Sequence, residues 1–323
     1  MRKLHLLYFL LPILFSCGQT RENKVLKLAH GLDPTHPVHK GMMVLAEKVK
    51  EKSDGKLQID IYPSGQLGSE QQCVELLQIG SLALTKVSTA VLESFTDNFQ
   101  VLGLPYIFRS KEHSFNVLDG EVGKGLLLST ERYKIRGLCY YDAGARSYYA
   151  INKAIESPAD LKGMKIRVMK SQTAMDMVKH MNGSPTPISW GELYTALQSG
   201  VVDGAENNPP SFYTSRHYEV CKHYSLNEHT RVPDVIIISS VVWNKLTDQE
   251  KLWLQEAADE SVDAQRQFWA QSEEESLRIV KEAGVNVIYP EKEPFAKTVK
   301  AMLDAYKDKP ELYELIKKIQ SIE

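Results

Sequence analysis

The feature of this sequence that most limits its fold is an alternation of short strand-like runs with longer helix-like runs. Residues 25–29 and 57–61 are short runs that predict β-strands, and the longer stretch 38–53 between them predicts a helix. A second helix is expected after Ser69, because Ser69 and Gln72 have the spacing of a capping box. Strands that alternate with helices predict an α/β fold, in which helices cover a sheet.

The length of the chain predicts more than one lobe. Its 323 residues exceed the size at which a single hydrophobic core usually stops growing, so we expect two lobes with a cleft between them. We place the first lobe at 25–142 plus 232–268 and the second at 143–231 plus 269–323. The β-rich run over 135–151 is expected to be a strand that crosses between the lobes.

Three further segments extend this prediction. The apolar run 235–243 predicts a strand buried on both faces, which we expect to return to the first lobe. Ser189 and Glu192 have the spacing of a capping box, and so do Thr247 and Glu250. The second of these pairs opens a helical pattern without an internal breaker, long enough to lie across both lobes.

The start of the chain has the composition of an export signal. Two basic residues precede the apolar run 4–15, which is too short to span a bilayer as a permanent helix. Residues 14–17 resemble a lipobox, so we expect a lipoprotein signal peptide over 1–17, lipid attachment at Cys17 and a tether over 18–24. The alternative is an ordinary signal peptide without a lipid. Either one places the protein in an extracytoplasmic, periplasmic location.

Composition and motifs argue against several classes of function. A formal net charge of −2, without any basic cluster, gives no general attraction to nucleic acid or to anionic lipid. The sequence contains no G-x-S-x-G elbow, Walker loop or H-E-x-x-H, so we expect neither an enzyme nor a cofactor. His36 and His39 are close together but lack the partners of a metal site, so no metal is expected either.

Two arginines, Arg146 and Arg167, occur in strand-like apolar segments. A charge in such a segment is costly unless it is paired, and a bound carboxylate could pair one of them. The planar guanidinium suits this role because it can donate two parallel hydrogen bonds to a carboxylate. The alternative for each arginine is an ion pair with an Asp or Glu of the chain itself.

Other candidate binding residues follow the predicted strands, where ligands of open α/β sheets bind. Asn207 and Asn208 could donate to and accept from an acid with hydroxyl groups, but turn chemistry before two prolines is the alternative. Glu70 could contact the ligand or could be a favourable charge in the first turn of a helix. His36 could contact the ligand or could be an ordinary loop residue.

Four stretches of the chain together resemble the solute-binding proteins of TRAP transporters, the tripartite ATP-independent periplasmic family. They are PSGQLGSE at 63–70, DLKGMKIRV at 160–168, GELYTALQSGVVDGAENN at 191–208 and HYEVCKHY at 217–224. The resemblance extends over nearly all of the chain after the tether. It implies a periplasmic-binding-protein-like fold without catalytic activity, in which two α/β lobes joined by a hinge, and spanned by a long helix, close on an organic acid.

The same resemblance implies roles for single residues. Arg167, in the strand KIRV, matches the main carboxylate clamp of the family, and Asn207 matches the asparagine that helps to hold the same group. Arg146 matches the second arginine of many members. Glu70 falls where members often place a hydrogen-bonding acid from the opposite lobe. His36 corresponds to a first loop that varies among members.

The combination of GAENN, HYEV and R-x-Y-Y is similar to members that bind sugar acids such as glucuronate and galacturonate, so the expected ligand is a hexuronate. C4-dicarboxylates, sialic acid and other hydroxy acids stay open as ligands. A sensory binding module and a secreted enzyme acting on acidic sugars stay open as functions. The expected partners are a small organic acid and the membrane subunits of a TRAP transporter. The protein is expected to be a monomer that touches the membrane through its lipid alone.

Overall fold

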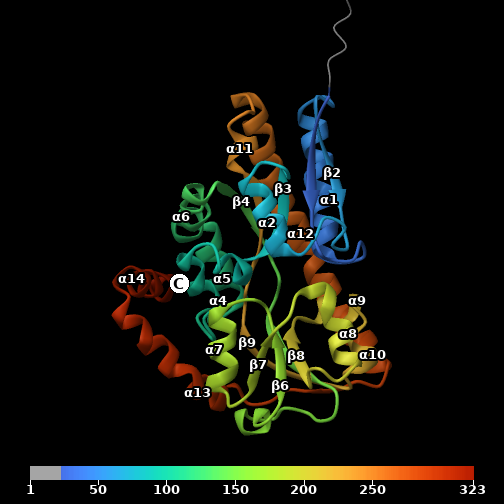
Figure 1. The fold of residues 1–323 in the computed structure, drawn as a ribbon, viewed down its shortest axis with the longest axis vertical. Helices are drawn as coiled ribbons and strands as arrows, with labels where there is room; N and C mark the ends of the chain where they lie inside the picture. Colours follow the sequence, from blue (N-terminus) through green and yellow to red (C-terminus); the bar gives the residue numbers. More distant parts are fainter. Residues whose placement is uncertain (1–22) are drawn as a thin grey trace, which may run out of the picture.

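The computed structural model describes residues 23–323 and has two lobes, each built on a sheet of its own (Figure 1). The expected signal peptide over 1–17, the expected lipid site Cys17 and most of the expected tether over 18–24 lie outside the described residues. Within the described part of the chain, no helix combines the length and the hydropathy that crossing a bilayer requires.

The first lobe contains a five-stranded sheet with the order β2-β1-β3-β10-β4. Its strands are β1 (Lys24–Ala29), β2 (Leu57–Tyr62), β3 (Leu84–Ser88), β4 (Ile135–Tyr141) and β10 (Asp234–Ser239). Strands β1, β2 and β3 are parallel, whereas β10 runs antiparallel between β3 and β4. Every residue of β10 is buried, as expected for an apolar strand with neighbours on both sides. This strand therefore returns to the first lobe, as predicted.

The second lobe contains a six-stranded sheet with the order β11-β9-β5-β8-β6-β7. Its strands are β5 (Arg146–Ala150), β6 (Lys165–Val168), β7 (Ser184–Pro187), β8 (Gly204–Asn207), β9 (His223–Thr230) and β11 (Asn286–Ile288). Strand β6 is parallel to β7 and β8, so the carboxyl ends of these three strands lie at one edge of the sheet. That edge faces the first lobe and carries four of the candidate binding residues, Arg146, Arg167, Asn207 and Asn208.

Helices cover both sheets. Those of the first lobe are α1 (Pro37–Lys52), α2 (Glu70–Gln78), α3 (Thr89–Leu92), α4 (Gln100–Gly103), α5 (Lys111–Asp119), α6 (Glu121–Ser129) and α11 (Ser240–Trp243). Those of the second lobe are α7 (Gln172–His180), α8 (Leu193–Gln198), α9 (Pro209–Thr214), α10 (His217–Val220) and α13 (Lys292–Ala305). The strand predicted over 235–243 ends at Ser239 because the hydroxyl of that residue accepts a hydrogen bond from Val242 N and so caps α11.

The last helix, α14 (Pro310–Ser321), returns to the first lobe. Its buried face, which includes Leu312 and Ile316, belongs to the hydrophobic core beneath α4 and α6. Arg109 of the first lobe also donates a hydrogen bond to Gln320 O, at 2.8 Å. The sequence-based assignment of all of 269–323 to the second lobe therefore differs from the structure at this helix. The apolar stripe of α14 is buried on the first lobe.

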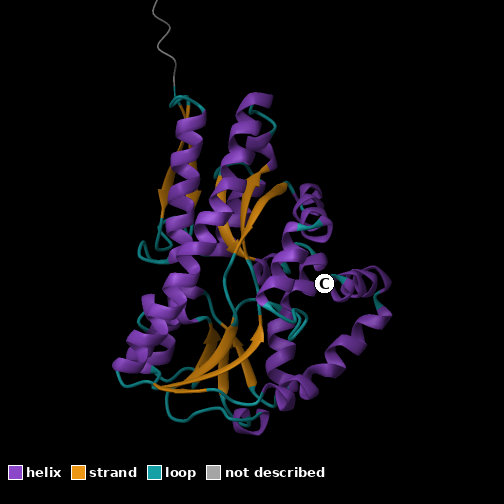
Figure 2. Cartoon of the chain, turned by 180° about the vertical axis from the view of Figure 1, so that it is seen from behind, coloured by secondary structure: helices purple, strands orange, loops and turns teal. Residues whose placement is uncertain are grey.

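The chain passes between the lobes at three places. The β-rich run 135–151 crosses between the lobes as predicted, but as two strands and not one, with β4 in the first sheet and β5 in the second. A second connection joins β9 to β10, and the third is α12 (Asp248–Glu282), a helix of 35 residues. Figure 2 shows this helix passing along the back of the molecule from one lobe to the other, where it packs on α1 and α9.

Local signals account for the beginnings of several helices. The capping boxes of Ser69 with Gln72 and of Thr247 with Glu250 form as predicted, so each pair satisfies backbone donors at a helix start. The box expected at Ser189 does not form, because the chain enters a 3-10 turn there and the Ser189 side chain makes no capping hydrogen bond.

Candidate functional site

A cavity of about 680 Å³ lies between the lobes. On the first lobe it is lined by residues that follow or end three strands: Gly31 after β1, Ser64 after β2 and Ser88 at the end of β3. On the second lobe it is lined in the same way by Met169 after β6, Ile188 after β7 and Asn208 after β8. The carboxyl ends of strands from both sheets therefore meet at one cavity, as expected for ligand sites of α/β proteins.

Arg167 lies in this cavity without an acidic partner. It is 2% exposed, and its Nε donates a hydrogen bond to Ile188 O at 2.8 Å. Its Nη1 is buried without a hydrogen-bond partner, and no ion pair found within residues 23–323 includes it. Burial lowers the pKa of Arg167, yet a guanidinium stays charged at neutral pH. The cavity therefore holds a buried positive charge that an anion from outside can neutralise.

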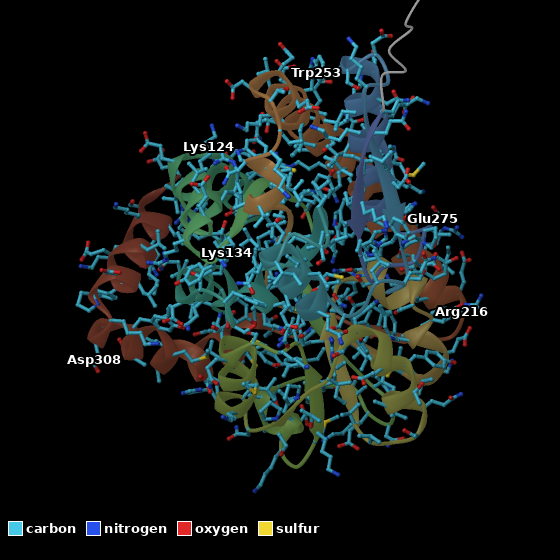
Figure 3. The ribbon with its side chains drawn as sticks, turned by 45° about the horizontal axis from the view of Figure 1, so that its top comes forward. Lys124, Lys134, Arg216, Trp253, Glu275 and Asp308 are labelled. Carbon is cyan, nitrogen blue, oxygen red and sulfur yellow. The ribbon has the colours of Figure 1, made fainter. Side chains whose placement is uncertain are left out.

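The burial of Arg167 contrasts with the surface position of most charged side chains. In Figure 3, the labelled residues Arg216, Glu275 and Asp308 lie at the periphery of the molecule, and all three are exposed to solvent. Arg167 instead has the indole ring of Trp190 near it, with the guanidinium carbon 5.9 Å from the ring centre. An aromatic face stabilises a cation only in part, so this contact does not replace an anionic partner.

Arg146 is already paired, which is the second of the two alternatives that the sequence left open. Its Nη2 donates to Glu206 Oε1 at 2.9 Å and its Nε donates to Glu206 Oε2 at 2.5 Å. Burial opposes the ionisation of Glu206, but the Arg146 guanidinium and His229 together outweigh burial and lower the Glu206 pKa to about 2. Arg146 lines the cavity, but its charge is balanced within the second lobe.

Asn207 is oriented by this ion pair. Its Oδ1 accepts hydrogen bonds from Arg146 Nη1 at 2.8 Å and from Asn208 N at 2.9 Å. The amide NH₂ group of Asn207, which lines the cavity, is therefore left to donate to a ligand. Asn208 also lines the cavity, but both ends of its amide have protein partners: Oδ1 accepts from Ser211 N and Nδ2 donates to Ala143 O. The Asn208 side chain therefore has the structural role of a turn and cap residue, which is the alternative that the sequence left open.

Glu70 faces this site from the first lobe, at the start of α2. Its Oε1 accepts a hydrogen bond from Lys86 Nζ at 2.8 Å, and its Oε2 accepts one from Ser88 N at 3.2 Å. Lys86 Nζ also donates to Asp234 Oδ1 at 3.1 Å. Sequence reasoning missed Lys86 and Asp234, although Lys86 carries the same signal as Arg167, a charge within a short apolar strand.

His36 does not line the cavity, which corrects the expectation that it contacts the ligand. It is buried as the N-cap of α1, where its Nδ1 accepts a hydrogen bond from Val38 N. Burial lowers the pKa of His36, so the ring is neutral and its proton is on Nε2. That Nε2 donates to Ser211 Oγ at 3.1 Å, and Ser211 does line the cavity. His36 therefore lies behind a cavity residue of the other lobe.

The described residues show no other obvious reactive centre. No group of three or more His, Cys, Asp or Glu side chains that could hold a metal ion occurs in residues 23–323. The three cysteines in this range, Cys73, Cys139 and Cys221, are unpaired and buried. Burial raises the pKa of each of their thiols, so they are weak nucleophiles. The three cysteines therefore act as buried small apolar side chains.

Comparison with known proteins agrees with this geometry. The family model described as bacterial extracellular solute-binding protein, family 7 (DctP), matches residues 28–309. The chain is 37% identical to the protein YiiZ of Salmonella typhimurium over 309 residues, which are 95% of this chain and 93% of YiiZ.

Solved structures of TRAP periplasmic solute-binding proteins are also similar to this chain. The protein from a Bradyrhizobium species, in complex with galacturonate, has a TM-score of 0.90 at 36% identity and covers 92% of this chain and 99% of its own. The protein from Roseobacter denitrificans, with bound β-D-glucuronate, has a TM-score of 0.90 at 35% identity and covers 93% of this chain and 100% of its own. The chain therefore belongs to family 7 of the bacterial extracellular solute-binding proteins, the periplasmic solute-binding subunits of TRAP transporters, which bind solutes for transport and are not enzymes.

Proposed function

We propose that this protein captures a hexuronate, such as glucuronate or galacturonate, and delivers it to the membrane subunits of a TRAP transporter. The observation that carries the proposal is the buried, unpaired guanidinium of Arg167 in the cavity between the lobes. A cavity of about 680 Å³ is within the range of ~300–1,000 Å³ that is usual for small-molecule sites. The similar proteins from Bradyrhizobium and Roseobacter denitrificans hold galacturonate and glucuronate, respectively.

The contacts of the cavity residues suggest how a sugar acid binds. The ligand carboxylate accepts hydrogen bonds from Arg167 and from the amide NH₂ of Asn207, which Arg146 holds in orientation. Glu70, on the lobe opposite to Arg167, accepts hydrogen bonds from the ligand hydroxyls. His36 donates a hydrogen bond to Ser211 Oγ. The hydroxyl proton of Ser211 is therefore left to donate to a ligand oxygen.

The location of the protein completes the proposal. We expect Cys17 to become the lipid-bearing first residue after removal of residues 1–16, so that the mature monomer is held at the membrane near its permease. Replacing Cys17 with Ala should release the protein from the membrane fraction. Mass spectrometry of the wild-type N-terminus should detect the added acyl chains. A mature N-terminus without a lipid would support the ordinary signal peptide instead.

The binding proposal is tested by a thermal-shift screen followed by calorimetry. The screen contains D-glucuronate, D-galacturonate, succinate and N-acetylneuraminate, so that each ligand class is represented. We expect the hexuronates to raise the melting temperature most and to bind with a dissociation constant on the order of 1 μM, which is about −8 kcal/mol. A larger shift with succinate or N-acetylneuraminate would replace the hexuronate assignment with that ligand class.

A further inference from the structure

The two walls of the cavity differ in the sign of their charge. The second-lobe wall contains Arg167, which forms no ion pair with an acidic side chain of the described residues. The first-lobe wall contains three carboxylates, those of Glu70, Glu75 and Asp234, and a single cation, Lys86. A ligand whose carboxylate pairs with Arg167 therefore presents its other end to a wall with an excess of negative charge.

Lys86 is the centre of that wall. Its ammonium group lies 2.8 Å from Glu70 Oε1 and 3.1 Å from Asp234 Oδ1, and its side chain is 4% exposed. Burial disfavours the charge on Lys86, but Asp234 and Glu70 outweigh burial and raise its pKa, so it stays an ammonium. When both carboxyl groups are ionised, one cation between them leaves one negative charge uncompensated, and this charge lies against the cavity.

The hydrogen-bonding capacity of the wall points the same way. Glu70 uses one oxygen for Lys86 and the other for Ser88 N, and each carboxylate oxygen can accept a further hydrogen bond. Hydroxyl groups can donate to these oxygens. A ligand carboxylate has no proton to donate there, and its charge is repelled by Glu70 and Asp234.

We propose that the wall formed by Glu70, Lys86 and Asp234 makes the protein selective for acids with one carboxylate and hydroxyls at the opposite end, and that it excludes acids with a second carboxylate at that end. This inference rests on the proposed function, because it takes Arg167 as the carboxylate site. It names a determinant of specificity on the lobe opposite to the clamp.

The test compares two open-chain acids that differ at one end alone. D-Gluconate ends in a CH₂OH group where D-glucarate has a second carboxylate, and the remaining carbons and hydroxyls are shared. Calorimetry is performed with both acids and with D-glucuronate. The pH is 8, because burial raises the pKa of Asp234 and a higher pH favours the ionised form of its carboxyl group. We expect glucarate to bind about 100-fold more weakly than gluconate, the order expected when like charges are brought within a few ångströms in a partly buried site.

Variants then locate the cause. Glu70→Gln and Asp234→Asn each remove one negative charge, and each should reduce the gluconate-to-glucarate preference about tenfold or more. Glu75→Gln is the matched control, because Glu75 is exposed at the rim and solvent screens its charge, so the preference should stay within about twofold of wild type. If Glu70→Gln and Asp234→Asn both fail to fold, the wild-type protein is tested alone. Its preference for gluconate over glucarate should then decrease as salt is added, because salt screens the repulsion between the wall and the second carboxylate.

The outcomes for the two proposals are distinct. Binding of glucarate within threefold of gluconate overturns the selectivity inference, while binding of glucuronate in the same experiment keeps the proposed function. An unchanged preference in both folded variants also overturns the inference. Absence of glucuronate and galacturonate binding overturns the proposed function, and the gluconate and glucarate pair then decides the selectivity alone. Absence of binding by all of these acids overturns both.

Discussion

The carboxylate of Glu93, on the first lobe, accepts a hydrogen bond from the hydroxyl of Ser171 on the second lobe, at 2.9 Å. The same oxygen, Oε2, accepts a hydrogen bond from Thr173 N at 3.1 Å, in the first turn of α7. Ser171 belongs to the loop that follows the strand of Arg167. Glu93 thus joins the first lobe to the segment next to the proposed carboxylate clamp, and its other oxygen is buried without a partner.

This contact should make stability depend on pH. Burial raises the Glu93 pKa from 4.5 to about 7, with the hydrogen bonds from Thr173 and Ser171 opposing the shift and Asp176 adding to it. A carboxyl whose pKa is raised on folding stabilises the protein fully below pH 4.5, and this contribution is lost as the pH rises through 7. Relative to Glu93→Gln, the wild type should therefore lose about 3 kcal/mol of unfolding free energy between pH 4.5 and pH 8.

Urea denaturation of both proteins across this pH range measures the difference. Glu282→Gln is the control, because Glu282 lies on the exposed side of α12, and its difference from wild type should stay within about 0.5 kcal/mol. A wild-type minus Glu93→Gln difference that is flat with pH, or that rises with pH, would contradict a buried carboxyl that is protonated near neutrality.

Replacing Arg167 with Met should separate binding from stability. The substitution removes an unpaired buried charge and keeps most of its volume, so the ligand-free protein should melt at or above the wild-type temperature. Binding should weaken at least about 100-fold, because the carboxylate loses charge-assisted hydrogen bonds of about 1.5–3 kcal/mol each. Differential scanning calorimetry with and without D-glucuronate measures both effects. A ligand-induced shift equal to that of wild type would exclude Arg167 from the site.

Helix starts and strands could be predicted, because the residues that mark them are neighbours in the sequence. The partners of the buried charged side chains could not be predicted, because they come from distant parts of the chain. The box of Thr247 with Glu250 was readable because both residues lie in one helical turn. The apolar strand contexts of Arg146 and Arg167 are alike, so they do not show which of the two guanidinium groups lacks a partner within the chain. Glu206 distinguishes them, but it is 60 residues from Arg146 and meets it through the pairing of β5 with β8.

The misplaced features have the same physical origin. His36 was expected to contact the ligand because it follows a strand, but the packing of α1 buries it behind Ser211 of the other lobe. Lys86 was overlooked because its partners, Glu70 and Asp234, come from segments on either side of it in the sequence. The apolar stripe of α14 fits either lobe by composition alone. In each case the deciding contact joins residues far apart in the chain.

Breaking the Arg146–Glu206 pair should have the opposite effect to removing Arg167. Arg146→Met leaves the Glu206 carboxylate buried without its ion-pair partner, which should lower the unfolding free energy by about 3–5 kcal/mol. It also leaves Asn207 without the hydrogen bond that orients its amide, so ligand affinity should fall as well. Arg278→Met, which breaks an exposed pair with Glu282, should cost less than about 1 kcal/mol. Equal losses for the two arginines would contradict the burial of the Arg146 pair.

Gly41 lies in α1 where this helix packs on α12, and replacing it should destabilise the protein. A Cβ added at Gly41 would lie 2.7 Å from Cβ and Cγ of Gln265, whose amide donates to Asp142 O and accepts from Asp142 N at the crossing between the lobes. Gly41→Ala should therefore destabilise the protein by about 1–3 kcal/mol, because it forces α1 and α12 apart.

Gly125 has the opposite surroundings, and this makes its substitution the matched control. It lies within α6, is exposed, and has no neighbouring atom within 4 Å of an added Cβ. Gly125→Ala should therefore stabilise the protein by about 0.5–1 kcal/mol, because alanine loses less backbone freedom in a helix than glycine does. Chemical denaturation of both variants measures the two changes. Stabilisation by Gly41→Ala would mean that α1 and α12 are not in close contact at Gln265. The two hydrogen bonds between Gln265 and Asp142 would then not depend on the packing of α1 against α12.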